Sequence, residues 1–130
     1  MRGSRVLKWE KRLKDIFDRI DVELEEEYGD RFSLRPSRPE AGETANPEAS
    51  GLFNIGAAFS AGYGSEHGRG YIVRVHMSTS SRVPDEVEEE IERKVVEKLE
   101  SLLPEKFGEQ NLRVERDGNV FKIVGDFGLD

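Results

Sequence analysis

The sequence predicts an α+β fold in which two helices pack on one face of a four-stranded antiparallel sheet. Two stretches, residues 4–28 and 84–103, repeat apolar residues every three or four positions, as amphipathic helices do. Two others, residues 52–79 and 112–123, alternate apolar and polar residues around a turn, as β-hairpins do. Because each hairpin has one apolar side, both helices are expected on that side of a single domain spanning residues 1–130.

The first helix is predicted from one apolar stripe over residues 4–28, with Gly29 placed for a left-handed cap at its end. Its stripe comprises Val6, Trp9, Leu13, Ile16, Phe17, Ile20, Leu24 and Tyr28. Residues 1–20 hold seven basic and three acidic side chains, whereas residues 21–30 hold six acidic and none basic. This order opposes the helix dipole. Three explanations stay open: a solvated helix face, a second helix lying parallel to the first in the same chain, or the antiparallel helix of a two-fold-related copy.

The segment from about residue 30 to residue 51 is expected to be a mobile linker. Pro36, Pro39 and Pro47, with Gly42 and Gly51, interrupt both helical and strand periodicity. A connection of this length without elements of its own is uncommon in a compact domain, and such connections are usually functional or disordered. Residues 40–50 are expected to be its most mobile part.

The first hairpin is the most strongly specified element. One constant register pairs its apolar residues on a single face: Phe53 with Met77, Ile55 with Val75, Ala57 with Val73, and Phe59 with Tyr71. A slip by one residue would turn one apolar set toward water, so the face is well defined. Phe53, Ile55, Phe59, Val73 and Val75 are therefore expected to face both helices.

The second helix is expected to start at Pro84, which suits a first turn, and to end at Pro104. Its buried stripe comprises Val87, Ile91, Val95, Leu99 and Leu102. The second hairpin is predicted with Asp117 and Gly118 as its turn. That turn sets Val114 opposite Phe121, Leu112 opposite Ile123, and Arg113 opposite Lys122.

Composition excludes several classes of function. The chain has no cysteine, which rules out thiol chemistry and disulfides, and its two histidines, His67 and His76, are too far apart for a local metal-ligand pair. A net charge of −7 argues against general nucleic-acid binding. No apolar run is long enough to span a membrane, and no signal peptide is recognised, so a cytoplasmic location is expected. The high content of charged residues, 36%, is also typical of thermophile proteins.

The glycine-rich tip of the first hairpin is the first candidate site. Gly64 and Gly68 would let backbone N–H groups approach an anion, and His67 and Arg69 would supply charge. The tip lacks the Gly-Lys-Ser/Thr of a phosphate-binding loop, and no catalytic-loop motif of a kinase follows it. The alternative is a turn whose glycines supply positive φ angles.

The second candidate site is the hairpin face opposite the apolar one. Arg74 and His76 project there over small residues, so Arg74 would hold a carboxylate or phosphate and His76 would act as an acid or base. The same face would equally serve as a solvated surface or as a surface that packs a second subunit. No nucleophile or second carboxylate is placed beside these residues, so no catalytic residue and no metal or cofactor site is assigned.

Three classes of function follow from these observations. The favoured one is a non-enzymatic binding or assembly module that acts as a homodimer, because no catalytic constellation is present. The second is a small enzyme or anion-binding protein that uses the glycine-rich tip with Arg74 and His76. The third is a client-binding, chaperone-like protein. The expected partners are a second copy, another protein or a small anionic ligand, with neither nucleic acid nor membrane among them.

Overall fold

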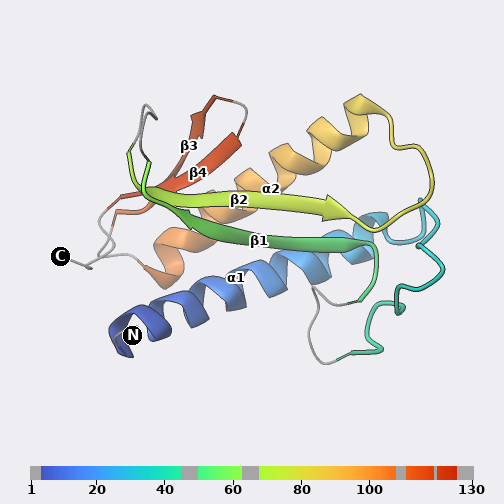
Figure 1. Cartoon of the computed structure of the whole chain (residues 1–130), viewed down its shortest axis with the longest axis horizontal. Helices are drawn as coiled ribbons and strands as arrows, with labels where there is room; N and C mark the ends of the chain where they lie inside the picture. Colours follow the sequence, from blue (N-terminus) through green and yellow to red (C-terminus); the bar gives the residue numbers. More distant parts are fainter. Residues whose placement is uncertain (1–3, 45–49, 63–67, 108–110, 119, 126–130) are drawn as a thin grey trace.

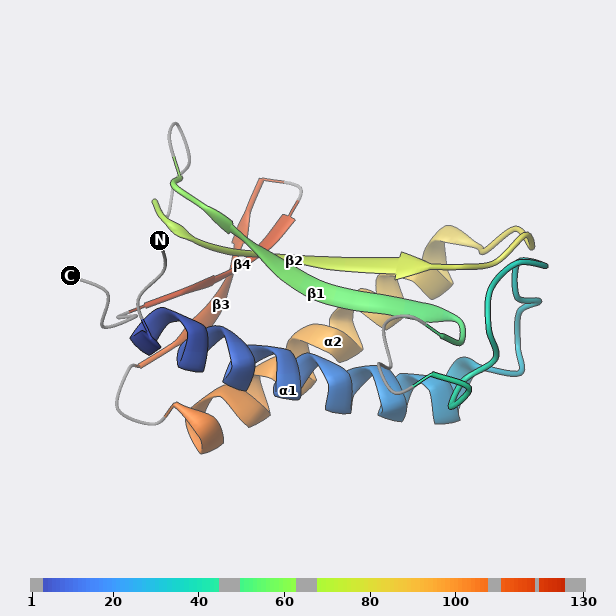
Figure 2. The same cartoon turned by 60° about the horizontal axis from the view of Figure 1, so that its bottom comes forward.

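The computed structural model describes residues 4–44, 50–62, 68–107, 111–118 and 120–125. The elements, in order, are α1 (Ser4–Tyr28), β1 (Phe53–Ser60), β2 (Gly70–Met77), α2 (Asp85–Lys106), β3 (Arg113–Asp117) and β4 (Val120–Val124). The strands form one antiparallel sheet in the order β1-β2-β4-β3, and both helices lie on one face of it (Figures 1 and 2). The predicted α+β fold is confirmed.

The long hairpin has the predicted register along its whole length. Phe53 lies opposite Met77, Ile55 opposite Val75, and Ala57 opposite Val73. By contrast, β2 and β4 pair only at Tyr71–Ile123 and Ile72–Lys122. From Val73 onward, β2 therefore has no strand partner on its β4 side among the described residues. The two hairpins are joined at one end and separate toward the other.

The second hairpin is shifted by two residues from the predicted register. Val114 lies opposite Ile123, and Glu115 lies opposite Lys122. Asp117 pairs with Val120, so the loop begins at Gly118, whose φ is +64°. The predicted register would have set Arg113 opposite Lys122, and like charges directly opposite each other are unfavourable. In the observed register Glu115 lies opposite Lys122, so the two charges have opposite signs. A shift of two preserves the faces.

The core lies between the sheet and the two helices. Most of its buried side chains come from α1, the long hairpin and α2. They are Trp9, Leu13, Ile16, Phe17, Ile20 and Leu24 of α1, Phe53, Ile55 and Tyr71 of the long hairpin, and Ile91, Val95, Leu99, Leu102 and Leu103 of α2. Val73 and Val75 are half-buried and pack against this cluster. The helix stripes and the inner face of the hairpin were thus predicted correctly with one exception, while the side chain of Val6 lies outside the described residues.

Phe59 is the exception, since its side chain is 52% exposed rather than covered by a helix. Its cross-strand partner Tyr71 stacks on Trp9, with ring centroids 4.8 Å apart, and takes the last covered position on the inner face. Phe59 packs edge-on against Tyr71 at 5.6 Å. A large apolar side chain is therefore left in solvent at the end of β1.

The helices are antiparallel, which rules out the parallel second helix as an explanation of the charge order of α1. Lys94 contacts Glu27, and Lys98, one turn later in α2, contacts Glu23, one turn earlier in α1. The two helices therefore run in opposite directions. The reason is the hairpin between them, which returns the chain to the end at which it began. Leu52, which precedes β1, is held beside α1 by Glu25 near the end of that helix. The chain leaves β2 at the same end and must run back as α2 (Figure 1).

Gly29 was expected to cap α1 and Pro104 to end α2, and neither expectation is met in the structure. Gly29 is not among the glycines with positive φ, and its N–H donates to the Glu25 carbonyl at 2.8 Å, which continues the helical pattern. Pro104 lies inside α2, which continues to Lys106. Phe107 closes the last turn by donating to the Leu103 carbonyl, and its buried ring lies 5.1 Å from that of Trp9. Packing of this aromatic pair favours the extra turn over the proline stop.

The described parts of the linker are tied to the hairpin. Leu34 forms an isolated bridge with Thr79, and the Gly51 N–H donates to the Pro39 carbonyl at 2.8 Å. The Arg38 guanidinium donates to three backbone carbonyls, those of Ser50, Gly51 and Phe53. These bonds set the start of β1. Mobility between residues 40 and 50 stays a prediction.

Candidate functional site

Arg74 and His76 lie on the face of the long hairpin that points away from the helices. They lie opposite Gly56 and Asn54 of β1, and both side chains are exposed. Because the strand partners are small, this surface is shallow. His76 lines a hollow that contains neither Arg74 nor Arg69. The structure thus places the two predicted residues on one face, and their role in binding stays a prediction.

The described part of the glycine-rich tip is used structurally. Gly68 has a φ of +72°, and its carbonyl accepts a hydrogen bond of 2.9 Å from Lys122. Arg69 is exposed and precedes β2. Gly64 and His67, the other two predicted anion-binding residues, lie outside the described residues. The tip therefore supplies a carbonyl to a buried lysine and, in its described part, no converging set of anion donors.

Two features that would indicate a class of function are absent from the described residues. Among the described residues, no three or more His, Asp and Glu side chains converge in a way that could hold a metal ion. Within the same ranges, neither helix contains an apolar stretch of the length needed to cross a membrane.

The outer edge of β1 is the first feature that the sequence analysis missed. β1 is an edge strand of the sheet. Ser78 donates to the Leu52 carbonyl, so the even-numbered residues of β1 bond to β2 and the odd-numbered ones direct their N–H and C=O groups outward. Arg38 takes the outward carbonyl of Phe53. The outward groups of Ile55, Ala57 and Phe59 have no partner strand in the described residues.

A hollow of about 330 Å³ runs under this edge, between β1 and α1. Leu13 and Phe17 of α1 and Ile55 and Ala57 of β1 line it, together with Tyr71. Its rim carries charges of both signs, Glu10, Lys14 and Asp18. The edge is therefore bordered by apolar surface and by side chains that can form ion pairs.

Internal contacts account for the acidic end of α1. Lys94 forms an ion pair with Glu27, and its ammonium group lies 5.0 Å from the centre of the Tyr28 ring. The hydrogen bond that Lys94 donates to Glu27, followed by its hydrogen bond with Tyr28, raises the pKa of Lys94. The Glu25 carboxylate accepts the Leu52 N–H at 2.9 and 3.0 Å. The acidic end of α1 is thus matched by α2 and by the start of the hairpin within the same chain.

A second missed feature is the groove between the unpaired part of β2 and the first turns of α2. A hollow of about 350 Å³ lies there, lined by Val75, His76 and Met77 of β2 and by Glu88, Ile91 and Glu92 of α2. It exists because β4 leaves β2 after Ile72. Strand order and strand separation are tertiary properties, so neither edge could be found by periodicity. One signal was available for the β1 edge: the segment FNIGAAFS carries no charge and no proline.

Comparisons with known proteins place the chain among relatives whose activity is not described. A family model described only as "Uncharacterised protein" matches residues 4–125. An uncharacterised protein of Borreliella burgdorferi is 39% identical over 108 residues, which cover 83% of this chain and 84% of that protein. No solved structure matches.

Proposed function

The chain belongs to this uncharacterised protein family, and on that premise we propose that it is a non-enzymatic binding and assembly module whose working unit is a homodimer. One observation carries the proposal: among the described residues, the outer edge of β1 has no partner strand from Ile55 to Phe59, and β1 has no charged residue, in a chain of which 36% of the residues are charged. Edge strands of monomeric proteins usually carry charges, prolines or bulges that prevent pairing with another chain. β1 has no charged residue and no proline.

A two-fold axis beside β1 would join the two sheets into one. With Ala57 of each copy at the axis, Ile55 of one copy lies opposite Phe59 of the other. The outward backbone groups of Ile55, Ala57 and Phe59 then bond in pairs across the axis. This register also covers the exposed ring of Phe59, so each apolar contact is made twice.

The surroundings of the edge support the same interface. The hollow between β1 and α1 offers apolar surface from Leu13 and Phe17. Antiparallel copies of α1 would bring Lys14 of one copy near the acidic rim residues of the other. Exposed ion pairs contribute only about 0.2–1 kcal/mol each, so backbone bonds and apolar burial would supply most of the affinity.

Sedimentation equilibrium tests the interface with an Ala57→Pro variant. Proline removes one outward N–H and leaves the β1–β2 bonds in place, and edge strands tolerate it. We expect the parent chain to be a dimer and Ala57→Pro to be a monomer that keeps its circular dichroism spectrum. Ala57→Ser is the matched control and should stay dimeric. Phe59→Lys, at an exposed position, should weaken the dimer without unfolding the chain.

Salt dependence separates this interface from one held by the charges of α1. A strand-edge dimer should change little between low and high ionic strength, whereas a dimer joined by ion pairs should dissociate as salt rises. A parent chain that is monomeric at every concentration tested would overturn the homodimer. A dimer that survives both Ala57→Pro and Phe59→Lys would show that the interface lies elsewhere.

A further inference from the structure

The separation of β2 from β4 opens a continuous groove over α2. The hollow of about 350 Å³ beside β2 and a second hollow of about 760 Å³ share Glu88 and Glu92 in their walls. The second hollow extends along α2 to Arg116 of β3 and Phe121 of β4. Figure 1 shows the second hairpin at the other end of the sheet from the first turns of α2, which no strand covers.

The wall formed by β2 offers backbone hydrogen-bonding groups. Because the even-numbered residues of β2 bond to β1, Val75 and Met77 direct their N–H and C=O groups to the groove side. No described strand pairs with them there. An extended chain laid along this edge would satisfy these groups, which is the basis of recognition by strand addition.

The side chains of the groove define what such a chain must carry. Half-buried Val75 and Met77 and buried Ile91 form the apolar part of its lining, to which His76, Thr79 and Ser81 add polar groups. Glu88 and Glu92 flank Ile91 on the same helix. The second hollow adds four acidic side chains, Asp85, Glu89, Glu97 and Glu100, against two basic ones, Arg93 and Arg116. The groove therefore combines an apolar centre with a strongly acidic border.

We propose that this groove binds an extended, cationic segment of another protein as an added strand along β2. The open strand edge specifies an extended backbone, and charge complementarity specifies basic side chains. Alternate residues of a strand point to the same face, so every second residue of the segment would face α2. A basic–apolar–basic series at those positions would set the apolar residue over Ile91 and the basic ones toward Glu88 and Glu92.

The proposal rests on the function proposed above only in that the protein acts by binding. The groove lies along β2 and α2, whereas the dimer interface lies along β1, on the opposite edge of the long hairpin. A dimer would carry two such grooves. Peptide binding and dimerisation are therefore separate measurements, and each can fail while the other succeeds.

The test uses the full chain and a fluorescent peptide that contains Lys-Thr-Val-Thr-Lys. A peptide in which both lysines are glutamate tests charge, and one with an N-methylated valine tests the strand hydrogen bonds without altering the protein. We expect fluorescence anisotropy to show saturable binding of the lysine peptide, weakened by salt. The N-methylated peptide should bind several-fold more weakly, and the glutamate peptide should not bind.

Variants of α2 locate the binding site. The double variant Glu88→Lys/Glu92→Lys should weaken binding by about tenfold, since each exposed pair is worth up to about fivefold. Glu86→Lys is the matched control, because Glu86 is an exposed acid of the same first turn that lines neither hollow, and it should bind as the parent does. Met77→Pro removes an outward N–H of β2 and should weaken binding as N-methylation does.

Three outcomes would overturn the proposal. Equal binding of the lysine and N-methylated peptides would reduce the interaction to charge alone, without strand addition. Equal effects of Glu86→Lys and the double variant would remove the groove as the site. A change in oligomeric state of the Glu88→Lys/Glu92→Lys variant, in sedimentation without peptide, would show that a second copy fills the groove. Failure of the Ala57→Pro experiment, by contrast, affects only the dimer.

Discussion

At the scale of single residues, Arg38 decides how the linker meets the sheet. One planar guanidinium with several donors reaches the carbonyls of Ser50, Gly51 and Phe53 at 3.0–3.2 Å. The chain before β1 is thereby held in place, and the outward carbonyl at the start of β1 is satisfied. An ammonium group on a flexible stem cannot supply the same fork of donors.

Replacing Arg38 with methionine should lower the free energy of unfolding by about 2 kcal/mol, since hydrogen bonds from a charged group contribute about 1.5–3 kcal/mol. Urea denaturation measures the change. Arg38→Lys should recover only part of the loss. The exposed Arg35 of the same linker is the control, and Arg35→Met should stay within about 0.5 kcal/mol of the parent. Equal effects at both positions would contradict the assigned role.

The fold changes the titration of Lys94. Its pKa is raised above the ordinary value of 10.5 by Glu27 and Tyr28. A raised pKa in a cation means that the folded state binds the proton more tightly than the unfolded state does. The stabilisation is therefore complete below pH 10.5 and is lost as the pH rises through the folded pKa.

The pH dependence of Lys94→Met tests this linkage. The melting temperature of the variant should be lower than that of the parent by a constant amount through neutral pH. Above about pH 10.5 that difference should shrink, because the unfolded parent then releases the Lys94 proton and must take it up again to fold. Taking the difference removes the titration of the other lysines. A difference that is constant into the alkaline range would mean that Lys94 acts through packing alone.

At the scale of elements, the two hairpins differ in how well the alternation of apolar and polar residues predicts the register of strand pairing. In the first, eight residues on each strand alternate, so a slip by one residue would turn one apolar set outward, and the predicted register is the observed one. In the second, each strand has five residues, and a shift of two leaves the faces unchanged. Periodicity alone cannot distinguish those two registers, and the opposite charges of Glu115 and Lys122 favour the observed one.

A pair of aspartate substitutions on β1 tests the assigned face. Ile55 is 1% exposed, so Ile55→Asp places an unpaired charge in the core and should abolish the cooperative thermal transition. Ala58 is exposed on the opposite face of the same strand, and Ala58→Asp should melt close to the parent. Circular dichroism compares the two variants. A normal melt of Ile55→Asp would mean that the inner face is wrongly assigned.

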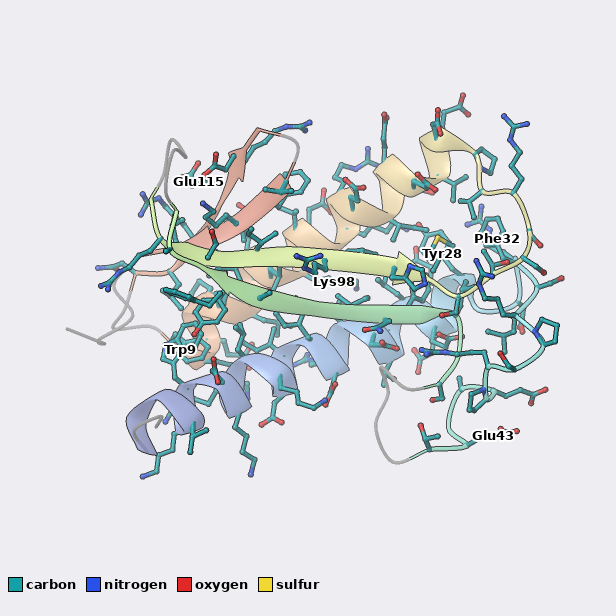
Figure 3. All side chains as sticks on the ribbon, in the orientation of Figure 1. Trp9, Tyr28, Phe32, Glu43, Lys98 and Glu115 are labelled. Carbon is teal, nitrogen blue, oxygen red and sulfur yellow. The ribbon has the colours of Figure 1, made fainter. Side chains whose placement is uncertain are left out.

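At the scale of the whole molecule, two helices cover one face of a sheet whose edge strands are β1 and β3, and in the described residues part of β2 also has no neighbour on its β4 side (Figure 2). Trp9 near the start of α1 and Tyr28 at its end are both buried and mark the two ends of the covered layer (Figure 3). The linker closes the end at which α1 stops and the long hairpin begins.

Limited proteolysis tests how firmly the linker closes that end. We expect brief treatment with a protease of broad specificity, such as subtilisin, to cut the parent first between residues 40 and 50, because this segment has few large apolar side chains to hold it against the core. Residues 31–39 should stay protected through Leu34 and Arg38. Arg38→Met should extend cleavage into them. First cleavage elsewhere, with residues 40–50 intact, would contradict the predicted mobility.

Local patterns in the sequence determined the identity of every helix and strand, the register of the long hairpin and most of the core. They could do so because period and turn chemistry act between residues close in the chain or directly paired across a turn. Only the tertiary structure decided the strand order, the exposure of Phe59 and the direction of α2, which follows from where the hairpin returns the chain. The open edge of β1 follows from the strand order, and the groove beside β2 follows from the separation of β4 from β2. Periodicity describes which face of a strand is apolar, and it carries no information on which strand lies beside it.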